Sequence, residues 1–404
     1  MTNSDIIIVG AGPVGMTAAL ALRALGRPAT VVEAGAQDRI RPGSRAIFIH
    51  SASLMLLEKI RPGLGHELNS YGLTWRTKRT FYRGKEIYHR TYPANPEGVM
   101  PRATSLPQIV TERLLYRTCM EAGVEFIWNT PIVSASVANG LVTLAAATGG
   151  SLRAQYVIAA DGSRSPVRET AGLRLEGPQT SNAFVIVDTR EDTEQPLPVE
   201  RIFHYKHPAV DDRNVLFVPF SGHWRVDLQC HPTDDPEKFS GVDGARTWLP
   251  KVMPEDYANR IAWVSTYIFR QAVANSFTDE SRRILLCGEA AHVFAPFGAR
   301  GLNSGIPDAI LAAGAIDRAL KSQSPYEASA AIDHFAASRR AAALRNRAAS
   351  NTALRHLTSA TILRRTAHRL AAMFAPMIPA AGRWMDSAPY GPVLGEPDVD
   401  GMQY

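Results

Sequence analysis

The first 35 residues combine short apolar runs with a glycine-rich turn and a longer segment of alanine and leucine. Residues 6–9 read Ile-Ile-Ile-Val, residues 10–15 read Gly-Ala-Gly-Pro-Val-Gly, and residues 30–32 read Thr-Val-Val. The alanine- and leucine-rich segment ends at Gly26, as is usual where a glycine closes a helix. Strands that are so continuously apolar are typical of a parallel sheet covered on both faces. The pattern therefore predicts a βαβ unit at the start of the chain.

The middle of the chain has a different pattern. Between residues 183 and 231, runs rich in β-branched and aromatic residues are separated by polar, proline-containing loops. Such runs are typical of an antiparallel sheet with one covered face. Residues 282–287 return to the buried-strand pattern, and from about residue 303 the composition is overwhelmingly helical. We predict an α/β fold with a Rossmann-like nucleotide-binding domain, an inserted and mostly antiparallel β-sheet domain, and a C-terminal helical segment.

The domain boundaries are placed where these patterns change. The nucleotide-binding domain is expected to be discontinuous, because the antiparallel pattern interrupts the βαβ pattern. We assign residues 1–75, 101–178 and 276–345 to the nucleotide-binding domain, 76–100 and 179–275 to the inserted domain that would hold a substrate, and 346–404 to a helical tail.

Gly10, Gly12 and Gly15 form a G-x-G-x-x-G motif between the first strand and the first helix. The first glycine permits a tight turn, the second lets the backbone approach a pyrophosphate, and the third allows close packing of the helix on the strand. The start of the helix adds free amides and the positive end of its dipole. Glu33 ends the second strand, where a carboxylate accepts hydrogen bonds from the hydroxyls of an adenosine ribose. These features predict a dinucleotide site but do not distinguish FAD from NAD.

Two further segments have the same order of strand, turn and helix. Residues 156–168 run from an apolar strand into the turn Asp161-Gly162 and a basic helix start. Residues 284–309 run from a buried strand through a loop rich in glycine and proline into a helix. Amides at such a helix start stabilise negative charge, and a reduced flavin carries its negative charge at the N1/O2 edge. Each glycine-rich turn alone is compatible with an ordinary strand-to-helix connection. The three turns in this order favour a flavin site.

With these three motifs the chain resembles the class A flavoprotein aromatic monooxygenases, the family of para-hydroxybenzoate hydroxylase, over roughly residues 4–340. The resemblance implies FAD as cofactor and NADPH or NADH as electron donor. It further implies that the Asp161-Gly162 turn serves both nucleotides, that Arg45 lies near the flavin pyrophosphate, and that Gln108 contacts the ribityl chain. The cofactor-binding residues that it implies are Gly10, Gly12, Gly15, Glu33, Arg45, Gln108, Asp161, Gly162, Gly288, Glu289, Pro296, Gly301, Leu302 and Asn303.

The third motif departs from the family pattern. The usual Gly-Asp is Gly288-Glu289 here, and the usual Pro-Pro-x-Gly-Gly-Gln-Gly-x-Asn is Ala-Pro-Phe-Gly-Ala-Arg-Gly-Leu-Asn at residues 295–303. Glutamate is one methylene longer than aspartate, so the loop must retreat slightly or reach the ribityl hydroxyls through water. Arg300 brings a permanent cation beside the flavin pyrimidine edge, where it would favour the anionic reduced flavin. Whether it contacts the flavin, the substrate or a neighbouring carboxylate stays open.

The resemblance also implies a mechanism. NAD(P)H would reduce FAD, dioxygen would form a C4a-hydroperoxyflavin, and this would hydroxylate a phenolic or related aromatic small molecule. Because that intermediate decays to peroxide in water, the site must be dry and closed when it forms. Pro296, in the loop expected to face the isoalloxazine, fits that demand, and we name Arg300 and His292 as further catalytic candidates. For His292, a place in the flavin loop without catalysis is the alternative.

The substrate pocket is expected between the antiparallel sheet and the flavin, lined by apolar side chains with a few polar anchors. Core packing is the alternative role for each aromatic candidate, because alternating strand residues must fill a core. Arg225 is equally compatible with a solvated, outward position. The candidate substrate residues are Tyr205, Phe217, Pro219, Trp224 and Arg225.

Composition narrows the class of protein. With 404 residues, 45% hydrophobic and 20% charged, disorder and coiled coil are disfavoured. Three scattered cysteines are too few for a disulfide framework or a metal cluster, which fits a cytoplasmic location, and no metal site is expected. We expect neither a signal peptide nor a transmembrane segment.

The net charge of +6 belongs to the C-terminal part of the chain. Residues 334–385 hold nine arginines, no lysine and no acid, so the remainder carries a net charge of −3. A nucleic-acid partner is therefore not expected. The tail is compatible with a basic amphipathic helix in weak contact with a membrane surface, but a helical cap docked by its apolar side is favoured. A monomer or a homodimer is expected.

Two other functional classes stay open. One is another flavin reaction on the same scaffold, such as epoxidation, dehydrogenation or a halogenase-like reaction. The halogenase Trp-x-Trp signature is absent, since no two of the six tryptophans lie two residues apart. The other class is a non-catalytic flavin-binding protein.

Overall fold

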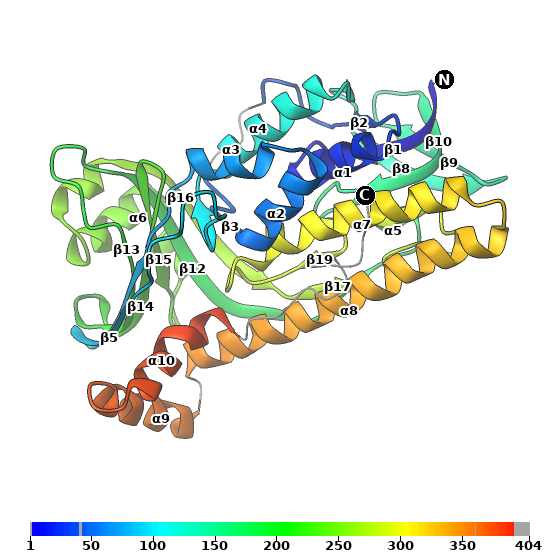
Figure 1. Cartoon of the computed structure of the whole chain (residues 1–404). Coiled ribbons are helices and arrows are strands. Elements are labelled where there is room, and N and C mark those ends of the chain that lie inside the picture. The colour runs from blue at the N-terminus through cyan, green and yellow to red at the C-terminus, as the bar shows by residue number, and fades with distance from the viewer. Residues whose placement is uncertain (1, 40–42, 360, 392–404) are drawn as a thin grey trace.

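A mostly parallel sheet lies at one end of the computed structural model, which describes residues 2–39, 43–359 and 361–391 (Figure 1). The strand order is β7-β2-β1-β10-β9-β8, and β18 also pairs with β10. Strands β7, β2, β1, β10 and β18 are parallel, whereas β8 and β9 form an antiparallel extension. The bounds are β1 Thr2–Val9, β2 Thr30–Val32, β7 Glu125–Ile127, β8 Ile132–Ala138, β9 Leu141–Ala146, β10 Ser151–Ala159 and β18 Ile284–Leu286.

The first helix forms where the sequence predicts it. Helix α1 spans Pro13–Ala24, with proline at its first position, where the missing N–H costs no hydrogen bond. Gly26 follows it with φ of +75°, the left-handed conformation that ends many helices. The apolar run Ile6–Val9 of β1 is buried on both faces, as its composition predicts. The predicted βαβ unit is therefore present.

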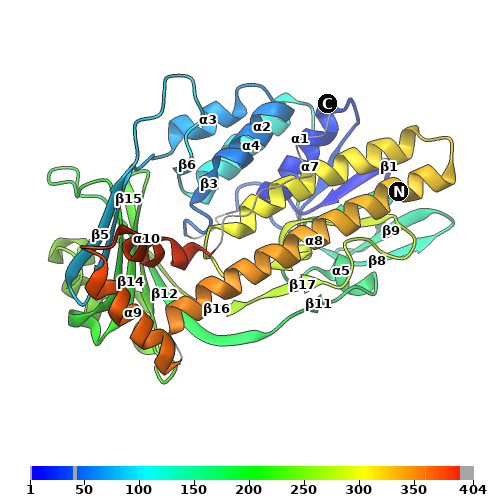
Figure 2. The same cartoon turned by 60° about the horizontal axis from the view of Figure 1, so that its bottom comes forward.

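Helices cover the parallel sheet, and the long helix α8 forms a further layer outside α7. Helix α1 packs against α4 and α7, and α7 packs against the long α8, as Figure 2 shows. The bounds are α2 Ser51–Ile60, α3 Leu64–Tyr71, α4 Gln108–Glu121, α5 Pro166–Thr170, α6 Gly241–Trp248, α7 Arg300–Lys321 and α8 Pro325–Thr358.

The second large sheet is mostly antiparallel, and it lies at the other end of the molecule in Figure 1. Its order is β16-β12-β15-β14-β13-β4-β5, with one parallel pair, β13 and β4. The bounds are β4 Thr77–Tyr82, β5 Lys85–Thr91, β12 Gln179–Arg190, β13 Glu200–His207, β14 Arg213–Phe220, β15 His223–Gln229 and β16 Ile261–Arg270. The mixed α/β architecture with an inserted antiparallel sheet agrees with the predicted fold class.

Short strands connect the two large sheets. Strands β3 and β6 pair with each other, and β17 pairs with both β11 and β19. Their bounds are β3 Phe48–His50, β6 Ala103–Ser105, β11 Leu175–Glu176, β17 Ala272–Ala274 and β19 His292–Val293. These short pairs lie where the chain crosses between the domains, so they fix the position of the crossing segments.

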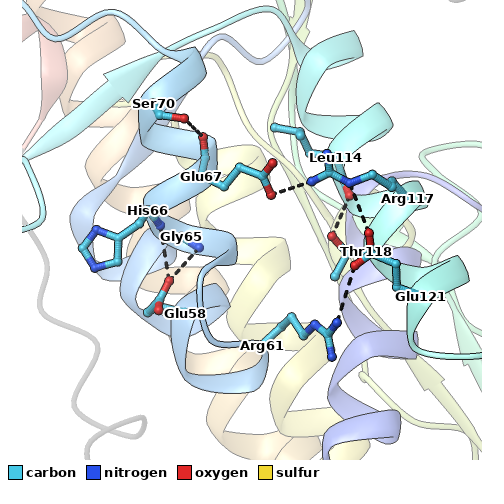
Figure 3. Close-up of polar contacts among 10 residues, drawn as sticks. All are labelled: Glu58, Arg61, Gly65, His66, Glu67, Ser70, Leu114, Arg117, Thr118 and Glu121. Carbon is cyan, nitrogen blue, oxygen red and sulfur yellow. Dashed lines mark hydrogen bonds and ion pairs between the residues drawn. The ribbon is translucent and has the colours of Figure 1, made fainter.

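Ion pairs tie α2 and α3 to α4 on the outer side of the parallel sheet (Figure 3). Arg117 of α4 donates to Glu67 of α3 at 2.5 Å, and Arg61, which follows α2, lies 3.5 Å from Glu121. Glu58 accepts hydrogen bonds from amides at the start of α3, including that of Gly65 at 3.0 Å. Exposed pairs of this kind each contribute little to stability. They lie across the contacts of α4 with its neighbours.

The C-terminal helices dock on the antiparallel sheet. Helices α9 (Ile362–Phe374) and α10 (Pro379–Ser387) follow α8, and a 3-10 turn, η6 (Ala388–Tyr390), is the last element among the described residues. Asp386 lies 3.2 Å from Arg201 of β13 and 3.9 Å from Lys78 of β4. The predicted start of the tail at residue 346 lies inside α8, which continues without interruption to Thr358.

A buried charged cluster joins α7, α8 and β19. Asp308 of α7 is fully buried and accepts from His292 Nε2 at 2.7 Å and from Arg339 Nε at 2.8 Å. It also accepts from the amide of Gly288 at 3.1 Å. Burial raises the pKa of Asp308, but His292 and Arg339 outweigh burial and hold the pKa below its usual value. The carboxylate therefore links both long helices to the third glycine turn.

We expect Asp308→Ala to lower the free energy of unfolding by about 3–5 kcal/mol, because it removes the carboxylate partner of two buried basic groups. Urea denaturation followed by circular dichroism measures the change. Asp333→Ala is the matched control, since Asp333 forms an exposed ion pair with Arg282 and its loss should cost at most about 1 kcal/mol. Equal losses in the two variants would contradict this account of the buried cluster.

Candidate cofactor and substrate site

The three predicted motifs meet at the carboxyl edge of the parallel sheet. The amide of Gly10 donates to Val32 at 2.8 Å, next to Glu33. The amide of Ala160 donates to Val9 at 2.9 Å, which places the Asp161 turn beside the Gly10 turn. Because β10 also pairs with β18, the Gly288 turn follows on the next strand. Ligands of open α/β sheets bind at this edge, so the strand order alone brings the motifs together.

The glycine turn after β1 leaves a cradle that a side chain would fill. Gly10 has φ of +105°, and a Cβ there would lie 2.4 Å from the carbonyl oxygen of Ala160. A Cβ on Gly15 would lie 1.9 Å from the carbonyl oxygen of Gly10. Gly12 is the N-cap of α1 in an extended conformation, and in the described structure no side chain caps its amides. The first turn of α1 therefore presents free N–H groups, as a pyrophosphate site requires.

Glu33 lies directly beside this turn. Its carboxylate accepts from the amides of Ala11 at 2.7 Å and Gly35 at 3.1 Å. Arg39 lies 3.6 Å away and donates to the carbonyl of Ala11 at 3.0 Å. A carboxylate held at the end of β2 in this way fits the ribose position of a dinucleotide.

Asp161 and Gly162 form the second turn. Asp161 Oδ2 accepts from the amide of Val167 at 3.3 Å, whereas Oδ1 is enclosed without a hydrogen-bond partner in the described ranges. Burial raises the pKa of Asp161, and this enclosed oxygen is available to a ligand. Gly162 has φ of +85°, which a glycine adopts without strain.

Close packing brings the helix that follows the third motif against α1. Gly288 has φ of +60°, and a Cβ there would lie 3.0 Å from Val14 of α1. A Cβ on Gly305 of α7 would lie 2.5 Å from the same valine side chain. Glu289, between these elements, is exposed. The starts of α1 and α7 therefore face one site, with the Glu289 carboxylate at its surface.

We call residues 295–303, which include the first turn of α7, the flavin loop, and this segment presents most of its predicted contact residues to solvent. Pro296 and Gly301 are exposed and Leu302 is half-buried. Asn303 instead binds the protein, since its amide donates to Phe48 at 2.9 Å and accepts from the backbone of His50 at 2.9 Å. The loop is thus anchored to β3 on one side and open on the other.

Ala299 and Arg300 stand where the family pattern has glycine and glutamine, and both have a structural consequence. Ala299 has φ of +53°, a conformation that a glycine adopts at lower cost. Arg300 is buried, and its guanidinium donates to Asn346 of α8 at 2.7 Å and to the carbonyl of Tyr390 at 3.0 Å. Burial lowers the pKa of Arg300. Arg300 thus joins the flavin loop to α8 and to the C-terminal turn. The sequence alone did not identify these two partners.

Residues 43–46, which we call the clamp loop, carry Arg45 and are held by the antiparallel sheet. Arg225 of β15 lies 3.0 Å from Asp188 of β12 and donates to the carbonyl of Arg45 at 2.5 Å. Ser44 bonds to both Asp188 and Arg225. Gln108 accepts from the amide of Ala46 at 3.2 Å. Arg225 is therefore buried in the domain contact, which corrects the outward, solvated alternative.

The strand register shows which side chains face the cofactor loops. Asp188 pairs with Arg225, so the residues in register with them share the face that meets the clamp loop. Phe217 pairs with Val226, and Pro219 pairs with Trp224. These pairs alternate with the pair of Val218 and Arg225, so they point to the opposite face of the sheet. Phe217 and Trp224 lie in the core cluster on the opposite side. This corrects the predicted place of Phe217, Pro219 and Trp224 in the pocket, because they alternate away from it.

Tyr205 and His292 are also held within the protein. The Tyr205 hydroxyl bonds to His356 at 2.8 Å and to the carbonyl of Met385 at 2.7 Å, so it packs under the C-terminal helices. His292 is buried below the Gly288 turn in its bond to Asp308. It therefore supports the flavin loop from beneath.

The sequence did not single out three residues that lie at the contact between the two domains. Burial raises the pKa of Tyr267 on β16, with further effects from Arg225, Arg45, Glu289 and Asp188. Its hydroxyl is therefore within electrostatic range of charges from both domains. Asp188 and Asp227 are the other two. The sequence does contain a feature that could have identified the two acids. Each lies within a strand that is otherwise mostly apolar, and a charged residue in such a strand needs a partner.

The residues at this edge fit an extended dinucleotide. The glycine cradle, the free amides of α1 and the Glu33 carboxylate suit the adenosine and pyrophosphate, and the enclosed Asp161 oxygen suits a hydroxyl donor. The exposed flavin loop would then face the ring system. Within the described residues, no helix is both long and apolar enough to cross a membrane.

Comparisons with known proteins agree with this geometry. The family model described as "FAD binding domain" matches residues 3–349. A 3-(3-hydroxy-phenyl)propionate/3-hydroxycinnamic acid hydroxylase of Burkholderia cenocepacia is 30% identical over 312 residues, which are 76% of this chain and 55% of that protein. A 6-methylpretetramide 4-monooxygenase of Streptomyces rimosus is 28% identical over 321 residues, 76% of this chain and 54% of that one. The chain thus spans about half the length of the curated relatives it matches.

Solved structures share the fold. The p-nitrophenol 4-monooxygenase PnpA of Pseudomonas putida superposes with a TM-score of 0.76 at 20% identity, over 98% of this chain and 100% of that one. The flavin-dependent monooxygenase PieE superposes with a TM-score of 0.74 at 20% identity, over 96% of this chain and 71% of that one. With its motifs gathered at one sheet edge and its sequence matched over most of its length, the chain belongs to the FAD-binding family of class A flavoprotein aromatic monooxygenases.

Proposed function

We propose that this protein is an FAD-dependent, NAD(P)H-using monooxygenase that hydroxylates a phenolic or related aromatic small molecule. The observation that carries the proposal is the convergence of three cofactor motifs on one sheet edge, opposite a second sheet whose facing side bears both charged and aromatic side chains. The names of the curated relatives support the same reaction class. A bound flavin would supply the redox chemistry and the activation of dioxygen.

The chain's own residues bind and orient the cofactor. The free amides of α1 would hold the pyrophosphate, and Glu33 would hold the ribose. The clamp loop, fixed by Asp188 and Arg225, sets the position of Arg45. Gly288 and Glu289 lie at the next strand end, where they suit the ribityl chain.

Aromatic side chains exclude water where the flavin loop meets the sheet. Phe297 lies 5.6 Å from Phe184 and 5.3 Å from Phe269, measured between ring centroids. Pro296, exposed beside them, offers an apolar surface without an N–H group. Such a lining suits a reaction that must be kept from water. Arg300 and His292 act here as positioning residues for the loop, through Asn346 and Asp308.

The reaction is tested by the mass of the product. The FAD-loaded protein is incubated with NADH or NADPH and a panel of phenols, with coenzyme oxidation followed by absorbance and products by mass spectrometry. We expect coenzyme oxidation that depends on an aromatic compound, and a product heavier by one oxygen atom. Loss of two hydrogens would instead identify a dehydrogenase, and a protein that takes up no FAD would refute every flavin reaction.

We expect Glu33→Ala to weaken FAD binding by about 10- to 100-fold, because a carboxylate that accepts hydrogen bonds is lost. Equilibrium dialysis of the apoprotein against FAD measures the dissociation constant. Glu255→Ala, which removes an exposed acid of the inserted domain that lies in none of the three motifs, is the matched control and should leave it unchanged. Wild-type affinity in Glu33→Ala would refute the placement of the ribose.

A further inference from the structure

Asp227 on β15 has a carboxylate oxygen that the protein leaves unsatisfied. Its Oδ1 is enclosed, and no residue in the described part of the chain forms a hydrogen bond with it. Its cross-strand neighbours, Ile186 on β12 and Leu216 on β14, are both apolar. An enclosed polar atom without a partner costs free energy, so its presence indicates a group that is absent from the protein alone.

The position of Asp227 on the sheet indicates which kind of ligand would supply the missing hydrogen-bond donor. On β12, Phe184 contacts Phe297 of the flavin loop, and Asp188 binds the clamp loop. Ile186 lies between them on the same face and pairs with Asp227. Asp227 is therefore placed between the two points where cofactor loops touch the sheet, and it faces the space where a substrate would meet the flavin.

We propose that Asp227 accepts a hydrogen bond from the phenolic hydroxyl of the substrate and so selects aromatic compounds that carry this donor. This inference rests on the proposed function. As the ring is oxygenated, the phenol O–H bond breaks and an O–H bond forms on the Asp227 carboxylate. The electron pair stays on the phenol oxygen, which increases electron density at the ring carbons ortho and para to it.

The charges around Asp227 make this role dependent on pH. Burial raises the pKa of Asp227 to about 7, while Arg225 lowers it and Asp188 raises it further. Hydrogen-bond acceptance needs the carboxylate, so binding of the phenol should strengthen as the pH rises through about 7. Its direct neighbour on β14, Leu216, is apolar. The charged groups that act on Asp227 are Arg225 and Asp188, and those that act on Tyr267 of β16 also include Arg45 and Glu289.

The test compares ligands that differ only in the donor. Binding of phenol and of 3-hydroxyphenylpropionate to the FAD-loaded protein is compared with binding of their methyl ethers, by calorimetry and by the change in flavin absorbance. We expect the wild type to favour a phenol about tenfold or more above neutral pH, as for a hydrogen bond to a charged group. Asp227→Leu should lose the preference, and Asp227→Asn should lose its pH dependence.

Controls separate this proposal from the proposed function. Asp211→Asn removes an exposed carboxylate and should behave as wild type, and the FAD content of each variant reports folding. If no phenol is favoured over its ether, or if both Asp227 variants keep the preference, the inference is wrong even where oxygenation is observed. If the protein favours a phenol over its methyl ether through Asp227 but forms no oxygenated product, the binding site is supported and the proposed hydroxylation is refuted.

Helix α9 carries a second feature that is independent of the site. Leu363, Leu370 and Phe374 recur at helical spacing, and 80%, 46% and 38% of each side chain is exposed. Met377 continues this apolar stripe beyond the helix, while His368 faces the protein. Figures 1 and 2 both show α9 at the end of the molecule away from the parallel sheet. A contiguous exposed apolar stripe marks an interaction surface.

Arginines flank the α9 stripe. Arg364, Arg365 and Arg369 are all exposed on the same helix. We infer that this helix lies on an anionic bilayer surface, with its apolar stripe among the acyl chains and its arginines at the headgroups. A two-fold contact between copies would bring the same arginines together, so charge complementarity favours the membrane.

Vesicle co-sedimentation of the full chain tests this surface. We expect binding to vesicles of phosphatidylcholine with phosphatidylglycerol, weaker binding at high salt, and little binding to phosphatidylcholine alone. Leu363→Ser with Phe374→Ser should abolish binding, whereas Tyr326→Ser, at an exposed aromatic elsewhere, should not. Absence of binding to the anionic vesicles would refute the inference, and a dimer that these two serines dissociate would identify a second copy as the occupant.

Discussion

The buried ion pair between Asp188 and Arg225 is the contact on which the site depends. It joins neighbouring strands of the antiparallel sheet and, through Ser44 and the carbonyl of Arg45, holds a loop of the other domain. Burying such a pair brings little net stability, because desolvation offsets the Coulomb attraction. Its value is positional, because it keeps the clamp loop in one fixed relation to the antiparallel sheet.

The second constraint is the close approach of α1, α7 and the Gly288 turn. Val14 occupies space that a side chain on Gly288 or Gly305 would need. Below it, Asp308 connects that turn to His292 and Arg339. The third motif thus tolerates the change to Ala299 and Arg300, because its backbone is held from beneath and Arg300 is anchored to α8.

The sequence predicted the elements that depend on neighbouring residues. The βαβ unit, Glu33 at the end of β2 and the Asp161 turn follow from local patterns, since glycine conformation and strand burial are properties of short segments. The two-domain α/β class followed from the change of pattern along the chain. Strand register was not predicted: Phe217, Pro219 and Trp224 lie on the face turned away from the clamp loop, and the pattern did not single out the acids Asp188 and Asp227.

By itself, then, the sequence determined the cofactor motifs, their order and the kind of sheet that accompanies them. Only the tertiary structure decided which face of the antiparallel sheet meets the flavin loop, because both faces are covered and a period of two does not distinguish them. It also decided the partners of Arg225 and Arg300. These lie far apart in the chain, and their pairing is set by strand register and helix docking rather than by any local pattern.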